Sequence, residues 1–296
     1  MSNYRSFRSL AVLSISVALL AISAQAQTKT KTKARAPAQS ESQDVSQPLV
    51  QPPLQGSISS QIVLGIADQF EPLWQMSQGA IDYSGLPASL QNEPDPVDPN
   101  APQPPRRWSE KPYQSCLKKR CEVSAMVMQG PAGYELWNMM ISSASGTVGT
   151  DYGSVAGKTT VADVHTHPFT YDYEDSNPFS GTDVVEPYRL YTTIRRELFK
   201  TGYVKIVRSG RSWYTLEIED ADKALAMYQA LAAAAKAKNN MTIRDYVNDI
   251  YTHTNHGTDI SNIRENCVIR LIGTAAVSGV GFYRIDNATH AVAKLN

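Results

Sequence analysis

Two histidines one residue apart, followed by an aspartate, carry the clearest chemical signal in this chain of 296 residues. They are His165 and His167, with Asp183 after a short interval. Residues i and i+2 of a strand share one face, so both imidazoles can reach the same ion. Two neutral imidazoles and one carboxylate suit Zn²⁺, and a catalytic zinc site keeps a fourth position open for water. The spacing therefore predicts a metal site formed by His165, His167 and Asp183, and hydrolysis by a metal-activated water.

A hydrolase of this kind also needs a general base that takes the proton from the attacking water. Glu122 is our first candidate, because it opens a hydrophobic run on a predicted strand close to the histidine strand. Glu135 lies on the next predicted strand and is the alternative.

The surrounding pattern predicts the elements that position these side chains. Runs over 122–129 and 134–142 flank a Gly-Pro-Ala-Gly turn and form a predicted hairpin. A third strand over 159–165 carries the histidines at its C-terminal end. We further expect a helix over 183–200, a hairpin over 203–208 and 212–218, helices over 221–238 and 242–252, and two strands within 267–286. This mixture predicts an α/β or α+β fold with a mixed sheet flanked by helices.

The order Glu122, His165-x-His167-Pro168, Ser180-x-x-Asp183 resembles the signature of the JAMM (JAB/MPN-type) zinc metalloproteases, over about residues 115–218. The resemblance implies a JAMM or cytidine-deaminase-like core. It also implies that the two histidines and the aspartate bind zinc, that Glu122 is the general base, and that Ser180 supports the tetrahedral intermediate. The implied activity is amide hydrolysis, often of isopeptide bonds.

The chain departs from that pattern in one loop. Twelve residues (168–179) separate His167 from Ser180, where the family's loop is shorter. The loop is either a substrate-recognition flap or a solvated loop without a role. Its acidic residues are alternatives to Asp183 as third ligand: Asp172, Glu174 and Asp175.

The N-terminal segment is typical of a secretory signal peptide. Arg5 and Arg8 precede an apolar run over 10–22, and Ala24-Gln25-Ala26 forms a small-x-small cleavage site. The alternative is a membrane anchor, but the run is shorter than the roughly 20 residues that span a bilayer. We therefore expect cleavage before Gln27, a mature protein without a membrane span, and a periplasmic or secreted location.

Composition divides the rest of the chain. Residues 27–106 are rich in Pro, Gln and Ser and are predicted to be a linker with one short docking helix over about 59–78, which Pro72 ends or kinks. Residues 107–220 form the predicted catalytic domain, and 221–296 an accessory region packed on it. Cys116 and Cys121 are candidates for a disulfide, with Cys267 left over or paired with one of them.

The functional expectation is an exported zinc metallopeptidase. The 28 Lys+Arg balance the 28 Asp+Glu, which excludes the basic field of a nucleic-acid-binding protein. The expected substrate is a peptide, isopeptide or peptidoglycan amide bond. Alternatives are a non-catalytic binding module, a secreted effector or toxin domain, and a structural zinc site. A second histidine pair, His253 and His256, is expected in an exposed loop, and the oligomeric state stays open.

Overall fold

The structure is a computed structural model that describes residues 57–110, 120–142, 148–168, 178–253 and 260–296, without the side chains of 260–263. The predicted signal peptide lies outside these residues. So do the alternative ligands in the loop after Pro168, Cys116 and His256.

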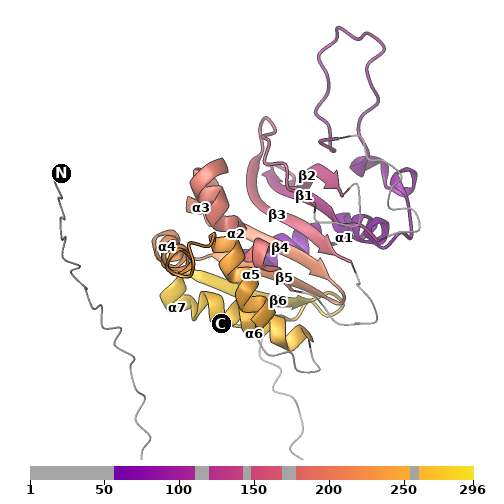
Figure 1. The fold of residues 1–296 in the computed structure, drawn as a ribbon. Helices are drawn as coiled ribbons and strands as arrows, with labels where there is room; N and C mark the ends of the chain where they lie inside the picture. Colours follow the sequence, from indigo (N-terminus) through magenta and orange to yellow (C-terminus); the bar gives the residue numbers. More distant parts are fainter. Residues whose placement is uncertain (1–56, 111–119, 143–147, 169–177, 254–259) are drawn as a thin grey trace, which may run out of the picture. The chain divides into compact units, whose positions relative to one another are not determined.

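Seven strands form one mixed sheet in the order β2-β1-β3-β4-β5-β6-β7 (Figure 1). The pair β3–β4 is parallel, and the other neighbouring pairs are antiparallel. The strands are β1 (Val123–Gly130), β2 (Gly133–Ile141), β3 (Thr159–His167), β4 (Val204–Ser209), β5 (Ser212–Ile218), β6 (Val280–Asp286) and β7 (Val292–Lys294). The expected mixed sheet with flanking helices is therefore confirmed.

Helices cover both faces of this sheet. The long helix α1 lies on one face, and α2 and α4 to α7 lie on the other (Figure 1). Their bounds are α1 (Ile58–Ser77), α2 (Gly181–Arg189), α3 (Arg196–Lys200), α4 (Ala221–Ala237), α5 (Ile243–His253), α6 (Ile260–Ile272) and α7 (Ala275–Ser278); the short turns are η1 (Tyr83–Gly85), η2 (Ala88–Leu90) and the π-helical η4 (Leu190–Ile194).

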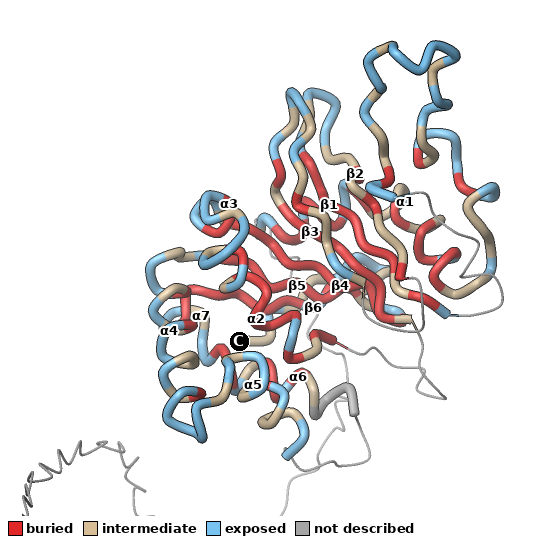
Figure 2. Tube along the Cα trace, turned by 45° about the horizontal axis from the view of Figure 1, so that its top comes forward, coloured by how far each residue is buried: buried red, intermediate tan, exposed pale blue. Residues whose placement is uncertain are grey.

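Alternation along β3 explains why the histidines face the helices α2 and α5. Ala162 and Val164 pack into the apolar cluster beneath α1. Asp163, His165 and His167 alternate with them and therefore point to the opposite face. Both faces are covered, so β3 is buried along nearly its whole length (Figure 2). The crossover from β3 to the parallel β4 runs through α2, η4 and α3, which places the start of α2 beside the end of β3.

Two predicted helix boundaries differ from the structure. Pro72 lies inside α1, which continues to Ser77 because Leu73, Trp74 and Met76 bury side chains beyond the proline. The helix predicted over 183–200 starts earlier, at Gly181, and is interrupted by the π-helical turn η4 before α3. The interruption follows Pro187, which cannot donate a backbone hydrogen bond.

The prediction of two strands within 267–286 is wrong in its first half. The run from Cys267 to Ile272 belongs to α6, and only Val280–Asp286 forms a strand, β6. Its buried residues are Cys267, Val268, Leu271 and Ile272, at helical spacing. The β-branched residues suggested a strand, but burial of this one face decided the conformation.

Cys121 is disulfide-bonded, as predicted for one member of the Cys116/Cys121 pair, whereas Cys267 is a free and buried thiol on α6. Among the described residues, no helix combines the length and the apolarity needed to span a bilayer.

Candidate metal centre

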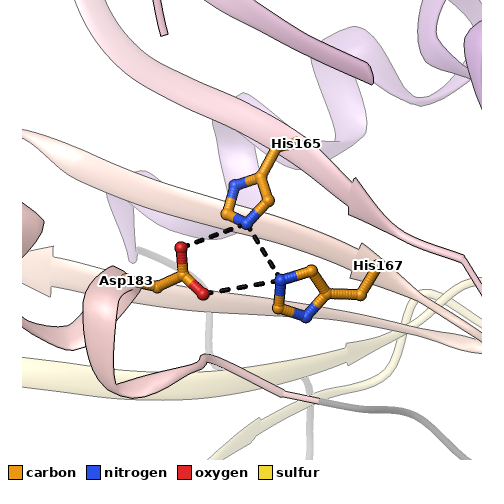
Figure 3. Close-up of side chains that lie close together, drawn as sticks. All are labelled: His165, His167 and Asp183. Carbon is orange, nitrogen blue, oxygen red and sulfur yellow. Dashed lines mark hydrogen bonds and ion pairs between the residues drawn. The ribbon is translucent and has the colours of Figure 1, made fainter. Parts of the chain in front are cut away.

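His165, His167 and Asp183 converge at the carboxyl end of β3 (Figure 3). His165 Nε2 lies 3.1 Å from His167 Nε2 and 3.2 Å from Asp183 Oδ1. His167 Nε2 lies 3.4 Å from Asp183 Oδ2. All three residues are buried, with exposed fractions of 4%, 7% and 9% in chain order.

The donor atoms are close enough to hold one metal ion. In a tetrahedral site with ligand distances of 2.0–2.1 Å, two donor atoms are separated by about 3.3 Å. The separation of 3.1 Å between the two imidazole nitrogens is close to this value. The contacts with Asp183 go to its two different oxygens, Oδ1 for His165 and Oδ2 for His167. One ligand atom from each of the three residues lies within 4.8 Å of the other two, so the group is compact enough to hold one ion.

The protonation of His167 supports the same conclusion. Its Nδ1 lies 3.2 Å from the carbonyl oxygen of Pro178, which can only accept a hydrogen bond, so Nδ1 carries the proton. In the neutral ring Nε2 then offers a lone pair toward Asp183. The Nε2 lone pair and the Asp183 carboxylate are both hydrogen-bond acceptors and repel each other. They attract only when a cation, either a proton or a metal ion, lies between them.

The two histidines also determine the charge of Asp183. Burial raises the pKa of its carboxyl group, but His165 and His167 outweigh burial and hold this pKa well below its usual range. Asp183 is thus a carboxylate, the form that binds a metal ion.

Ser180 fixes the position of Asp183. It is the N-cap of α2 and forms a capping box with Asp183, the third helical residue. The hydroxyl and the backbone N–H of Ser180 donate to Asp183 Oδ2 at 2.7 and 2.8 Å. The partial positive charge of the helix N-terminus further stabilises the carboxylate. In this arrangement the Ser180 hydroxyl is hydrogen-bonded to Asp183.

Glu122 immediately precedes β1, and Ser124, two residues later, pairs with His165 in the antiparallel β1–β3 ladder. The backbone N–H of Val123 donates to Thr166 Oγ1 at 2.9 Å, so the chain at Glu122 runs beside the histidine end of β3. One carboxylate oxygen of Glu122 accepts a hydrogen bond from the backbone N–H of Val148 at 2.9 Å. The second oxygen can therefore accept a proton from another group.

Glu135, the alternative base, lies elsewhere. It pairs with Met128 near the hairpin turn, and Met128 pairs with Thr160, five residues before His165 on β3. At about 3.3 Å per residue this is about 16 Å along the strand. Glu135 also forms ion pairs with Lys158 at 2.6 Å and Arg107 at 3.3 Å. Its geometry is that of a structural ion pair.

Compared with known proteins, the chain matches no family model, no curated protein and no solved structure. The argument for function therefore depends on the geometry of the described residues.

Sequence reasoning missed a buried polar network beneath the cluster. Lys205 on β4 donates to Asp163 Oδ2 at 2.5 Å, and Tyr203 donates to the other oxygen of Asp163. Burial lowers the pKa of Lys205, but Asp163 outweighs it and raises this pKa above the usual range, so the ammonium is charged. Two signals were available: Asp163 stands two residues before His165, and Lys205 interrupts an apolar run.

His253 is exposed as predicted, but the predicted loop position is wrong, because His253 is the last residue of α5 and pairs with Asp249 one turn earlier at 3.1 Å. Within the described residues, the group His165, His167, Asp183 is the one that could hold a metal ion.

Proposed function

We propose that this protein is a JAMM-like zinc hydrolase of amide bonds, with His165, His167 and Asp183 as metal ligands. The observation that carries the proposal is a buried group of two imidazole nitrogens, 3.1 Å apart, with one Asp183 carboxylate oxygen 3.2 Å from the first and the other 3.4 Å from the second. Zn²⁺ at such a site lowers the pKa of a bound water to about 7 and polarises a substrate carbonyl.

The roles of the other residues follow from their positions. Glu122 is the group that takes up and returns a proton at its second carboxylate oxygen, because it stands two residues before Ser124, the partner of His165 in the β1–β3 ladder. Pro178 holds the His167 tautomer, and Ser180 holds the Asp183 carboxylate. The family resemblance implies contact between Ser180 and the substrate; the capping box favours a positioning role instead.

The substrate is a peptide or isopeptide bond, in line with the family resemblance. The predicted signal peptide favours action in the periplasm or outside the cell, where peptidoglycan cross-links and foreign proteins offer amide bonds. A secreted effector or toxin domain would use the same chemistry.

The first test is metal analysis of purified protein. We expect about one zinc per chain in the wild type and little in His167→Ala. His253→Ala, which removes the exposed histidine of α5, is the matched control and should retain zinc. Wild-type protein without zinc after dialysis against a micromolar zinc buffer would refute the proposal.

A structural zinc site or a non-catalytic binding module is the second candidate, favoured by the burial of all three ligands. Hydrolysis of a peptide library and of peptidoglycan fragments separates the two. A hydrolase loses turnover but not zinc in Glu122→Gln. A structural site loses thermal stability when zinc is removed, and no substrate is cut in its presence.

A further inference from the structure

A cavity of about 490 Å³ adjoins the metal cluster and shares Asp183 with it. Its walls come from three parts of the chain: the segment 148–150 before β3, one side of α2 continued by Thr192 of η4, and residues 242–244 at the start of α5. Lys205 of β4 lines it from the sheet. The volume is within the 300–1,000 Å³ typical of ligand pockets. A substrate group held here would lie next to a bond positioned at the metal.

Two cations that line this cavity, Lys205 and Arg189, are already paired with a carboxylate. Lys205 Nζ lies 2.5 Å from Asp163 Oδ2, and both side chains are almost fully buried. Arg189 Nη2 lies 2.7 Å from Glu186 Oε1. At these distances each cation is neutralised by its own carboxylate. Neither pair gives the cavity a net charge.

Arg244 differs from these cations. Its nearest carboxylate, Asp245 Oδ1, is 3.7 Å from Arg244 Nε, and 62% of the arginine side chain is exposed. The other oxygen of Asp245 accepts the hydroxyl of Thr242 at 2.6 Å as part of the α5 cap. The guanidinium therefore retains N–H donors for a further anion, at a helix end that itself favours negative charge.

Apolar side chains complete the lining, with Val148, Val185 and Ile243 on three different walls. An aliphatic stem fits against these groups, while a terminal carboxylate reaches Arg244. A basic side chain would meet Arg244 at the same position and be repelled.

We propose that this cavity is a specificity subsite for an acidic residue adjacent to the cleaved amide bond, with Arg244 as the residue that recognises its carboxylate. The proposal rests on the hydrolase function for the cleavage itself, but binding in the cavity does not depend on it.

Binding is tested with two neutral-backbone probes that differ in one charge, the acetylated amides of glutamate and of glutamine. Ligand-observed NMR on the full chain gives both dissociation constants. The protein is first treated with a chelator, so that the carboxylate of the glutamate probe cannot bind to a metal ion. We expect the glutamate probe to bind about fivefold more tightly, the size of an exposed ion pair. Arg244→Gln should remove the preference, and Arg244→Glu should invert it.

Arg270→Gln is the matched control, since Arg270 is an exposed arginine in the last turn of α6, outside the cavity lining. It should retain the preference. Equal affinity of both probes for the wild type, or a preference that survives in Arg244→Gln, would overturn the subsite.

A second arm separates this proposal from the hydrolase function. If the glutamate preference depends on Arg244 but no peptide is cut, the subsite is retained and the hydrolase proposal fails. If peptides are cut at equal rates with acidic and neutral flanking residues, the hydrolase proposal is retained and the subsite is refuted.

Discussion

Replacing Ser180 with alanine distinguishes a positioning role from a catalytic one. The hydroxyl donates to Asp183 Oδ2 at 2.7 Å and accepts the Asp183 backbone N–H at 3.3 Å. Its removal takes away the helix cap and one of the hydrogen bonds that fix the ligand carboxylate. A residue that acts mainly on the substrate would leave metal binding intact.

The size of the effect follows from these contacts. Loss of a serine N-cap costs about 1 kcal/mol, and loss of a hydrogen bond to a charged group about 1.5–3 kcal/mol. Because one hydroxyl makes both contacts, we expect a total of about 1–3 kcal/mol. In a protein of this size, each kcal/mol corresponds to about 2–4 °C in Tm, so Tm should fall by about 2–12 °C. Loss of a residue that orients a ligand weakens metal affinity by about 10- to 100-fold.

Competition with a chromophoric zinc chelator gives the zinc Kd, and calorimetry gives the Tm. Ser57→Ala is the matched control: Ser57 caps α1 by accepting the Ser60 backbone N–H at 3.1 Å. It should lower the Tm by a few degrees without changing the zinc Kd. An unchanged zinc Kd in Ser180→Ala, together with a large loss of turnover, would contradict our reasoning and favour direct contact with the substrate.

Four further outcomes are expected. Zinc at 100 times its Kd should stabilise the protein by about 2.7 kcal/mol, which raises the Tm by about 5–11 °C, and a chelator should reverse the shift in a calorimetric scan. Glu122→Gln should lower turnover by about 10²- to 10⁴-fold at unchanged zinc content, whereas Glu135→Gln should leave it unaltered; equal losses would remove Glu122 from its role. The hydrogen bond from Lys158 lowers the pKa of Glu135, so this carboxylate contributes stability above its ordinary pKa and loses it as pH falls through the lowered value. Acid titrations of the Tm should therefore be flatter below about pH 4.5 in Glu135→Gln. Tyr251→Phe removes the hydroxyl that donates to the Phe179 carbonyl at 3.0 Å and should weaken zinc binding, measured by chelator competition, while the ring keeps its packing.

Short-range patterns predicted the part of the fold that carries the ligands. Two β-like runs around a Gly-Pro-Ala-Gly turn predicted the β1–β2 hairpin, and the spacing of two predicted both histidines on one face of β3. The motif Ser180-x-x-Asp183 is a helix start in its own right, so its location followed from local hydrogen bonding. These features depend on contacts between residues close in sequence.

The rest depends on long-range packing, which no local pattern encodes. The run after Cys267 has the β-branched residues of a strand, yet it is helical because α6 buries one face against the sheet. Our preference for Glu122 over Glu135 depends on the strand register: Ser124, two residues after Glu122, pairs with His165, whereas Glu135 pairs with Met128 near the hairpin turn.

The region after residue 220, predicted to be an accessory segment, supports the metal cluster directly. A Cβ atom on Gly181 would lie 2.2 Å from Asn248 Oδ1 and 3.1 Å from Val247 Cγ1, so a larger residue there would displace side chains of α5 from the first turn of α2. Tyr251 of α5 bonds the Phe179 carbonyl, and Tyr228 of α4 bonds the Val184 carbonyl at 2.8 Å. These contacts fix both sides of the turn that carries Asp183.

The N-terminal end of α5 also lines the cavity beside Asp183. The same helix therefore positions a metal ligand with one end and faces the adjoining cavity with the other. A boundary at residue 220 would separate the motif from the helices that hold its third ligand in place. Within α5, Tyr251→Phe should thus change metal affinity and Arg244→Gln substrate preference, although neither residue belongs to the motif.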